Sequence, residues 1–449
     1  MLDKRNVILT LYNHHLILAN KYRHVTFNII IEKLVSSYNT KAVAATLLGT
    51  RKLQLLILIM IIIIYQWPSV IPFLQKTLSY YIQNASAQQQ YTESDSCITY
   101  DPADNIIRIS CSHTDLTRIN NQLNDPDILH KETTDGVWLL NAGIIIEQNA
   151  TLYINSTDTS WMKIAADGET AYPILVSGSL KIDSVKVTSW NPNTNDYALT
   201  NNSDRNGRDT QIGTPRPYII VETVATGTMD ITNSEIAYLG YEGGYGAGRT
   251  GLRYLGGDGS MIKGNNIHNM WFGFYSKGVG GIVIEDNHIH HNGHYGLDPH
   301  TGTYDMIIRN NTVHDNGSTG IICSLDCYNI TIENNNVYNN TKYSIMFSRN
   351  MTDSIARNNV VSNEDNGIVI SESHNNEVYN NIVSDSGSGI DIDEDSFENV
   401  VYNNTIINIP DPSEALHLRD GASEQNTLHS NTLITINGEK RISLDVEQE

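Results

Sequence analysis

The chain is short of positive charge. It contains 29 lysines and arginines against 50 aspartates and glutamates, which gives a formal net charge of −21 over 449 residues. Nucleic acids and other polyanions are bound largely through an excess of basic side chains. The deficit argues against nucleic-acid binding as the main function. An acidic substrate could bind to such a chain only where a local group of basic side chains offsets the negative charge.

Cysteine is scarce as well, with four residues in the whole chain. The absence of a C-x2-C pair disfavours a structural zinc site. Cys97 and Cys111 lie close together on two predicted strands, and Cys323 and Cys327 form a C-x3-C. Because local pairs oxidise readily in an exporting compartment, we expect both pairs to form disulfides.

Helical periodicity and proline are nearly absent from the second half of the chain, and a longer period is present instead. From about residue 251 to 393, a small residue followed by alternating apolar and variable positions returns every 22 to 24 residues. Short strands at this period are typical of a parallel β-solenoid. A leucine-rich repeat has a similar period, but this chain lacks the regularly spaced leucines that such a repeat requires. The copies begin at Gly251, Gly273, Gly296, Gly320, Ser344, Gly367 and Gly389.

A column of asparagines keeps step with this repeat. Asparagine tolerates the left-handed conformation of a tight corner, and stacked copies can hydrogen-bond to one another. The sequence therefore predicts an all-β fold, a right-handed parallel β-helix over residues 137–440, with regular coils from about residue 216. The same corners create many Asn-x-Ser/Thr sequons, so glycosylation stays open. The column comprises Asn266, Asn287, Asn311, Asn336, Asn359, Asn381 and Asn404, with Asn431 as a weaker copy.

The N-terminal region has a different character. An apolar run over residues 53–74 follows two basic residues and precedes Ala85-Ser-Ala87, which predicts a secretory signal or a membrane anchor. We therefore interpret residues 1–90 as an extension, with a later start codon as an alternative, and residues 91–136 as a cap. The protein is expected to be extracellular or anchored at the cell surface, and to contact a membrane only through this segment.

Three consecutive copies of the repeat carry polar groups in their variable positions. Residues one period apart stack at about 4.7–4.9 Å, and strand positions alternate between the core and the outside. The spacing therefore predicts one exposed strip, three coils tall. Pro299 lies inside a strand against the usual preference, so we interpret the strip as a functional site, with a solvated polar face as the alternative. The strip contains Arg253, Tyr275, Lys277, Asp298 and His300.

The strip combines fixed cations with the titratable groups of Tyr295, Asp298 and His300. Removing the proton next to a uronate carboxylate requires a base and cations that neutralise the carboxylate. Epimerisation also requires an acid on the other face of the sugar ring. His291 and His294, at the corner before Tyr295, are alternatives for the base.

Three further sets of residues follow the same period. A histidine column is expected to pack or to face solvent, and an acidic patch is read as a solvated face, with a calcium site as the alternative. The inward positions are expected to fill the core. The column is His268, His290, His314 and Tyr338; the patch is Asp391, Asp393, Glu394 and Asp395; the core positions are Leu297, Ile321, Ile345, Ile368 and Ile390.

At these residues the chain resembles the mannuronan C5-epimerases, alginate-modifying enzymes built on a β-helix. The resemblance rests on Asn233-Ser-Glu-Ile-Ala-Tyr-Leu-Gly240, Phe272-Gly-Phe-Tyr275 and above all Tyr295-Gly-Leu-Asp-Pro-His300, and it covers about 216–350 well. It implies that His300 and Tyr295 transfer the proton and that Asp298 organises the site. It also implies an extended polyuronate groove and, in some members, a role for calcium.

Three positions depart from the family pattern. Thr301 follows the motif where an acidic residue is common, and Ser324 stands on the next coil where members can carry an aspartate. Lys342-Tyr-Ser344 stands where a later coil often supplies an Arg-His or Lys-His pair. The expected substrate-binding residues are Arg253, Tyr275, Lys277, His294 and Arg309, with no metal ligands and no required cofactor, calcium being optional.

The predicted function is C5-epimerisation of uronic acid residues in an extracellular polysaccharide, which makes the chain an isomerase. A polysaccharide lyase is an alternative, because it uses the same carbanion and then expels the 4-linked sugar. A non-catalytic surface β-helix that binds glycan is the second alternative. In each case the expected partner is an acidic polysaccharide and not a nucleic acid, and the protein is expected to be a monomer.

Overall fold

The computed structural model describes residues 97–200, 213–243, 249–419, 421–422, 425–435 and 441–446. The predicted signal or anchor over 53–74 lies outside the described residues. Within the described ranges, no helix combines the length and the apolarity that crossing a membrane demands.

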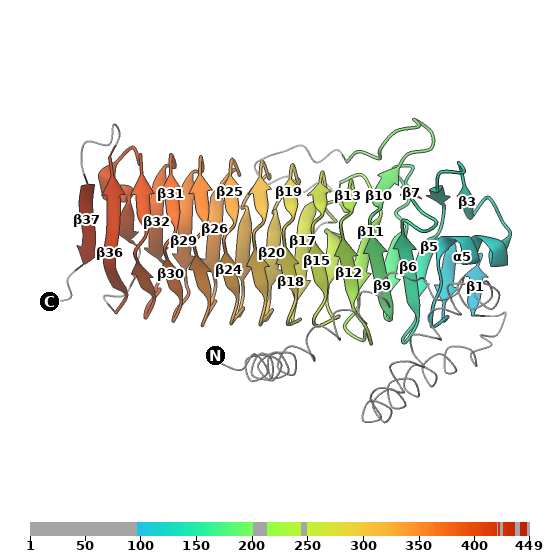
Figure 1. The fold of residues 1–449 in the computed structure, drawn as a ribbon, viewed down its shortest axis with the longest axis horizontal. Coiled ribbons are helices and arrows are strands. Elements are labelled where there is room, and N and C mark those ends of the chain that lie inside the picture. The colour runs from blue at the N-terminus through green and yellow to red at the C-terminus, as the bar shows by residue number, and fades with distance from the viewer. Residues whose placement is uncertain are drawn as a thin grey trace, which may run out of the picture. The chain divides into compact units, whose positions relative to one another are not determined.

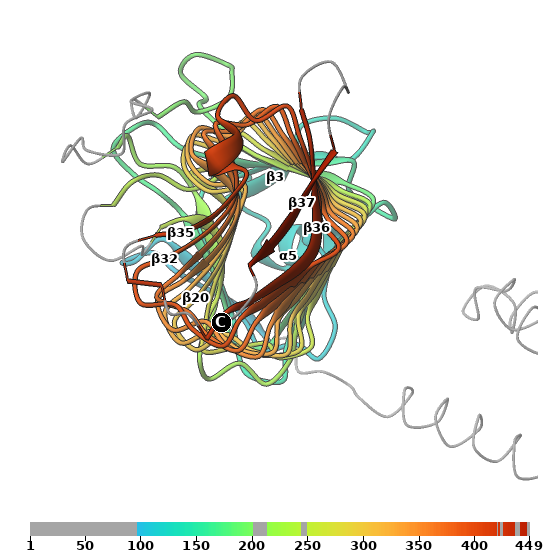
Figure 2. The same cartoon turned by 90° about the vertical axis from the view of Figure 1, so that its left-hand side faces the viewer.

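Each regular coil contributes three short strands, and corresponding strands of successive coils pair in parallel (Figure 1). In the end-on view, the strands of successive coils lie behind one another around a common axis (Figure 2). The arrangement confirms the predicted all-β parallel β-helix. Parallel stacking follows from the repeat, because each coil presents the same apolar alternation to its neighbours.

The described strands form a 13-stranded sheet and a 24-stranded sheet. The 13-stranded sheet takes one strand from each coil and carries the candidate site. In order, it contains β1 (Ile98–Asp101), β2 (Ile106–Ile109), β5 (Gly143–Ile146), β8 (Pro173–Val176), β11 (Tyr218–Val221), β14 (Gly251–Tyr254), β17 (Phe272–Lys277), β20 (Leu297–His300), β23 (Ile321–Ser324), β26 (Tyr343–Ser348), β29 (Asn366–Ser371), β32 (Ser388–Asp393) and β35 (Leu416–Leu418).

The 24-stranded sheet consists of two ladders, parallel except at their ends, that meet at the long strand β36 (Thr427–Ile434). The first ladder contains β6 (Thr151–Asn155), β9 (Ser179–Asp183), β12 (Met229–Thr232), β15 (Met261–Lys263), β18 (Val283–Glu285), β21 (Ile307–Arg309), β24 (Thr331–Glu333), β27 (Ile355–Arg357), β30 (Glu377–Tyr379) and β33 (Val400–Tyr402). The second contains β3 (Leu129–Lys131), β4 (Val137–Leu140), β7 (Trp161–Ala165), β10 (Lys186–Trp190), β13 (Glu235–Ala237), β16 (Asn266–His268), β19 (His288–His290), β22 (Thr312–His314), β25 (Asn336–Tyr338), β28 (Val360–Ser362), β31 (Ile382–Ser384) and β34 (Thr405–Ile407).

Antiparallel strands and a helix lie at the two ends of the described stack. Helix α5 (Leu116–Leu123) begins after Asp115, whose side chain accepts a hydrogen bond from the Arg118 backbone N–H at 2.7 Å. At the other end, β37 (Arg441–Val446) pairs antiparallel with β36. A short 3-10 helix, η3 (Pro412–Glu414), precedes β35.

One of the two expected disulfides is present. Cys97 and Cys111 are bonded, but Cys323 and Cys327 are free and buried, so the second predicted disulfide is wrong. The Cys323 side chain belongs to the core between coils, while the Cys327 thiol donates to the Ser324 carbonyl at 3.2 Å. Both thiols therefore stay buried and reduced within the stack.

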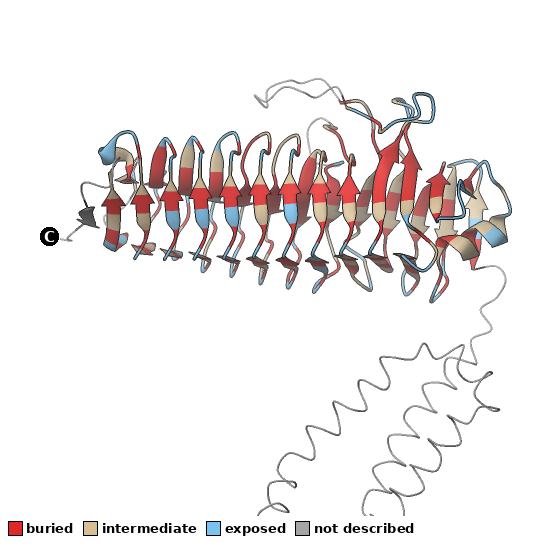
Figure 3. Cartoon of the chain, turned by 45° about the horizontal axis from the view of Figure 1, so that its top comes forward, coloured by how far each residue is buried: buried red, intermediate tan, exposed pale blue. Residues whose placement is uncertain are grey.

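The core runs through the centre of the stack. Buried residues recur at the same place in successive coils (Figure 3). The predicted inward positions are confirmed, because none of their surface is exposed. They are Leu297, Ile321, Ile345, Ile368 and Ile390.

The asparagine column is a buried hydrogen-bonded ladder. Both the backbone N–H and the side-chain Nδ2 of Asn287 donate to Oδ1 of Asn311, at 3.0 and 2.9 Å, and the pattern repeats along the stack. In two coils the prediction chose the wrong member of an asparagine pair. Asn265 and Asn335 occupy the ladder there, because Asn266 and Asn336 already belong to strands and point away from the core.

Candidate functional site

The predicted stacking of the strip is confirmed by the strand register. Arg253 is aligned with Tyr275, Tyr275 with Asp298, and Lys277 with His300. The strip is not exposed throughout, however, because Tyr275 is 4% and Asp298 2% exposed. That part of the prediction is wrong, since side chains pack across the strip. The Arg253 guanidinium lies 5.3 Å from the centre of the Tyr275 ring, and the His300 ring lies 5.5 Å from it on the other coil.

Asp298 is a buried carboxyl group. Burial raises its pKa well above the ordinary value, and the positive charge of Arg349 opposes that rise only in part. Its Oδ1 atom has no hydrogen-bond partner among the described residues. A buried polar atom without a partner destabilises the fold by about 1–3 kcal/mol. The site therefore contains an unsatisfied carboxyl oxygen beneath the packed side chains of the strip.

His300 is held as a neutral imidazole. Burial, followed by the charges of Arg349 and Lys277, lowers its pKa to about 4. Its Nδ1 lies 2.5 Å from the Thr301 hydroxyl oxygen. A hydroxyl that accepts from Nδ1–H leaves the lone pair on Nε2. Thr301 thus orients the ring without the negative charge that an acidic residue would place there.

Tyr295 lies on the same coil and has the opposite character. Burial, followed by the charge of Asp298, raises the pKa of its phenol to about 12, so the hydroxyl keeps its proton at neutral pH. The ring packs edge-on against Phe272 at 5.1 Å and lies tilted by 31° against the His294 ring at 3.9 Å. One coil therefore presents a neutral base and a protonated acid.

Arg349 is a site residue that sequence reasoning missed. It follows β26 at a corner, donates from Nη2 to the Ser324 hydroxyl, and acts electrostatically on Tyr295, Asp298 and His300. The predicted strip stops at the ends of the strands and spans only three coils. Extending it by one position and two coils leads from His300 through Ser324 and Ser348 to Arg349.

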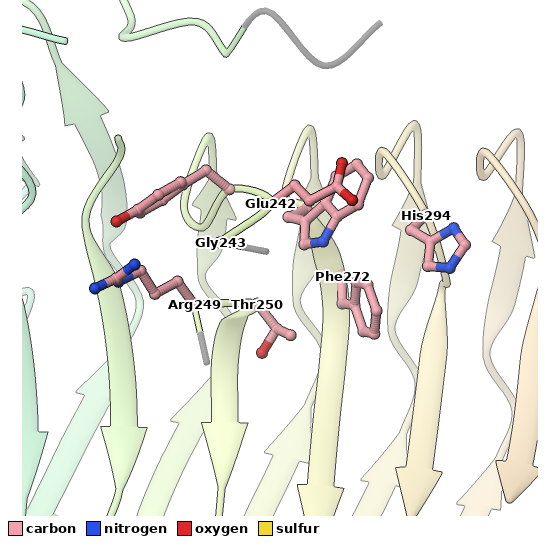
Figure 4. A pocket seen from close by; sticks show the side chains of 8 residues that line it. Glu242, Gly243, Arg249, Thr250, Phe272 and His294 are labelled. Carbon is pink, nitrogen blue, oxygen red and sulfur yellow. The ribbon is translucent and has the colours of Figure 1, made fainter. Parts of the chain in front are cut away.

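A pocket of about 170 Å³ adjoins the site (Figure 4). Arg249 lies at one end and His294 at the other, with Phe272 between them. The His294 ring stacks nearly parallel on Trp271 at 5.5 Å, and burial lowers its pKa to about 4. The aromatic rings of Trp271 and Phe272 can pack against a sugar ring, and the nearby Arg249 can pair with a carboxylate on that sugar. The lining residues are Tyr241, Glu242, Gly243, Arg249, Thr250, Trp271, Phe272 and His294.

Two other predicted residues lie apart from this site. Arg309 belongs to β21 on the other sheet, where its Nη2 and Nε atoms lie 2.5 and 2.6 Å from Oε2 of Glu285. His291 lies at the corner after β19 and contacts His290. Lys277, by contrast, is exposed at the end of β17 and adjoins His300 across the register.

The acidic patch does not form one solvated face, and that expectation is wrong for Asp391. This residue is 2% exposed, and its carboxylate accepts hydrogen bonds from Ser388 at 2.5 Å and from Arg419 at 3.2 Å. Asp391 pairs with His417 on the last coil. Arg419 follows two residues later, which places it near the Asp391 carboxylate. Protein groups, and not solvent, balance its charge.

Comparison with known proteins gives one family and a few relatives. The sequence profile described as a right-handed β-helix region matches residues 218–361 and 322–442. The mannuronan C5-epimerase of Pseudomonas fluorescens is 27% identical over 186 residues, which is 39% of this chain and 32% of the relative. The enzyme of the same name from Pseudomonas putida is 26% identical over 203 residues, 43% of this chain and 36% of the relative. The chain thus spans about a third of the length of these curated relatives.

The solved structures include a crystal structure of the periplasmic alginate epimerase AlgG. It superposes with a TM-score of 0.60 at 20% identity, covering 74% of this chain and 85% of that one. At this identity the similarity is informative about the fold alone, and it agrees with the β-helix described above.

Proposed function

The chain belongs to the right-handed β-helix family, and from that premise we propose that it is a C5-epimerase of uronate residues in a polysaccharide, of the mannuronan type. The observation that carries the proposal is the pair of His300 and Tyr295. Burial keeps the first neutral and the second protonated. The names of the two Pseudomonas relatives support the same reaction.

In the proposed reaction, His300 Nε2 takes the C5 proton while the electron pair of the C–H bond moves into the uronate carboxyl group. Arg349 and Lys277 stabilise the enolate that forms. Tyr295 then donates its phenolic proton to C5 from the opposite face, and solvent returns the protons to their starting groups. Asp298, whose pKa burial raises well above its ordinary value, is proposed to donate a hydrogen bond to the enolate oxygen.

An acidic polymer is the proposed substrate, although the chain itself is acidic. Arg253 and Lys277 belong to the strip, Arg349 acts on it from a later coil, and Arg249 lines the adjoining pocket. These cations locally offset the net charge of −21. The pocket, with Trp271 and Phe272, is proposed to hold the neighbouring sugar.

The reaction as written needs no cofactor, and calcium is proposed as an optional ligand of the polymer. The Cys97–Cys111 disulfide supports an oxidising compartment, so we propose that the protein is exported. We also propose that it is a monomer. Any membrane contact is proposed to run through residues 53–74.

The decisive experiment is incubation of the protein with polymannuronate in deuterated water, followed by NMR of the anomeric and C5 signals. Guluronate signals with deuterium at C5 are expected. An absorbance gain from an unsaturated product would assign a lyase instead. Binding of the polymer without exchange or cleavage would assign a glycan-binding β-helix.

Single substitutions then test the assigned roles. His300→Gln and Tyr295→Phe should each lower kcat by about 10²–10⁴-fold, the usual range for a proton-transfer group. His374→Gln, which makes the same change far along the stack, is the matched control and should leave kcat unchanged. Retained turnover in His300→Gln would remove this residue as the base.

A further inference from the structure

Five histidines gather on the second ladder of the 24-stranded sheet, apart from the proposed active site. The rings of His268, His290 and His314 stack nearly parallel, at 5.1 and 5.2 Å between ring centres. His288 and His291 flank this stack and are not part of it. The His291 ring stands edge-on to both His290 and His314, at 87° and 82°. Column packing explains the first three rings but not the flanking two.

The residue at the position of His291 is unusual for this fold. Its backbone is left-handed, with a φ of +54°, at the corner that follows the strand. Most equivalent corners of other coils use asparagine or aspartate, which adopt this conformation readily. His291 and Tyr238 are the aromatic exceptions among the described corners. The asparagine and aspartate corners are Asn269, Asp315, Asn339, Asn363, Asp385 and Asn408.

The hydrogen bonds around His291 determine which of its ring nitrogens carries a free lone pair. His290 Nε2 lies 2.9 Å from Asn266 Oδ1, which can only accept, so this nitrogen carries the proton. His290 Nδ1 is then an acceptor, and it lies 2.8 Å from His291 Nδ1. The His291 Nδ1 atom therefore donates, and the lone pair of this ring is left on Nε2.

The next coil supplies a second histidine with a carboxylate beside it. His314 Nδ1 lies 2.6 Å from Asp315 Oδ2, and its Nε2 lies 2.6 Å from His288 Nε2. Both nitrogens are hydrogen-bonded in the metal-free protein. A metal ion at Nδ1 would replace the proton shared with Asp315, and Nε2–H would then donate to His288 Nε2. Potential ligand atoms of His291, His314 and Asp315 all lie within 4.8 Å of one another.

We propose that His291, His314 and Asp315 bind a divalent first-row transition metal ion, with Zn²⁺ as the reference ion. Imidazole nitrogen with one carboxylate is a ligand set that such ions prefer, whereas Ca²⁺ and Mg²⁺ prefer oxygen alone. Tetrahedral bonds of about 2.0–2.2 Å require His314 Nδ1 and Asp315 Oδ2, now 2.6 Å apart, to separate somewhat. His291 and Asp315 are exposed, so their side chains can make that adjustment.

His288 and His290 then act as positioning residues. Each contacts the ring nitrogen of a ligand histidine, as groups around metal sites commonly do. Because His291 belongs to one coil and the His314–Asp315 pair to the next, the ion would link two neighbouring coils. The first linked corner comes just before the segment that carries Tyr295 and His300, and the second ends the coil to which that segment belongs.

The test is calorimetric titration of the untagged full-length protein with ZnCl2. One ion per chain is expected at this site, with at least a tenfold loss of affinity in His291→Ala. His374→Ala should retain the affinity. The double variant His14→Ala/His15→Ala, which removes two histidines that are consecutive in the sequence, should also retain it. Thermal unfolding should show that Zn²⁺ raises the Tm of the wild type and not of His291→Ala.

The outcomes separate clearly. Equal Zn²⁺ affinity in wild type and His291→Ala, or no binding by the wild type, would overturn the proposal. His291 lies at an exposed corner, so its variant should fold; an unchanged Tm without metal checks this. Binding of Co²⁺ in place of Zn²⁺ should give visible absorption bands, and these should be absent from His291→Ala and from His314→Ala.

Discussion

At the scale of single residues, burial decides the protonation state of the proposed catalytic groups. Desolvation is the largest influence on Tyr295, Asp298 and His300, and in each case it favours the uncharged form. A neutral imidazole and a phenol are therefore present together near neutral pH, beside a carboxyl group whose pKa burial raises. The nearby cations, foremost Arg349, remain to interact with the substrate.

The Thr301 hydroxyl should keep the activity of the enzyme available at low pH. An imidazole accepts a proton only above its pKa, so kcat/KM should hold at neutral pH and fall as the pH drops through about 4. Thr301→Asp would place an anion beside Nδ1, stabilise the imidazolium and move this acidic limb upward by about 1–3 pH units. Thr301→Ser is the control that keeps the hydroxyl. An acidic limb that stays in place in Thr301→Asp would show that another group titrates.

Asp298 should act as a hydrogen-bond donor and not as an anion. Asp298→Asn keeps a donor and should lower kcat by only about tenfold, whereas Asp298→Ala removes it and should lower kcat by about 10²–10³-fold. Because Oδ1 has no partner among the described residues, Asp298→Ala should also leave the Tm unchanged or raised. Equal kinetic losses in the two variants would indicate that the ionised carboxylate is the working form.

At the scale of elements, buried polar ladders specify the corners between strands. One ladder runs through asparagines from Asn265 to Asn431, and a shorter one runs from Asn292 through Asn316 and Asn340. The shorter ladder ends on Glu364, whose Oε1 accepts from the backbone N–H and from Nδ2 of Asn340 at 2.8 and 2.9 Å. A carboxyl group thus replaces an amide in a ladder that needs only an acceptor there.

Glu364→Gln should stabilise the protein in alkaline solution. Burial raises the pKa of Glu364 from 4.5 to about 7, so the folded state holds this proton more tightly than the unfolded state. Its contribution to the free energy of unfolding is complete below pH 4.5 and declines as the pH rises to about 7. The total decline is about 3 kcal/mol.

Urea unfolding of wild type and variant at pH 4.5 and pH 8 measures the effect. Glutamine keeps the accepting oxygen, so the variant should gain stability over the wild type only at the higher pH. Asp365→Asn changes an exposed neighbour and serves as the control. A gain of equal size at both pH values would mean that the carboxyl group is not the cause.

At the scale of the whole described solenoid, stability comes from contacts between neighbouring coils. Such a stack behaves as a nearly one-dimensional array, in which each repeat depends on the two beside it. The inward isoleucines fill these interfaces, while outward ones contribute little. The same residue type therefore has different weight at positions that the strand alternation separates.

Ile345→Ala and Ile382→Ala test this difference directly. Ile345 is fully buried, whereas Ile382 is 42% exposed. Ile345→Ala should lower the free energy of unfolding by about 2–5 kcal/mol, and Ile382→Ala by less than about 1 kcal/mol. Chemical denaturation of both variants gives the comparison. Similar losses would contradict the inward and outward assignment.

The sequence by itself determined the β-helix and the vertical alignment of its residues. A period of 22 to 24 residues can stack in only one way once alternation assigns each side chain to the core or the outside. The alignment of Arg253, Tyr275 and Asp298, and the fully buried Ile345, followed from that rule. A local rule was enough because neighbouring coils are nearly identical.

Only the tertiary structure decided what happens between side chains on different coils. Burial of Asp298, the contribution of Arg349 from two coils away and the free thiols of Cys323 and Cys327 depend on how side chains lean across the stack. Spacing fixes where a Cα atom lies along the solenoid, but not the direction of a long side chain or the solvent that it excludes. The protonation states of the proposed site follow from that exclusion, and so they required the folded structure.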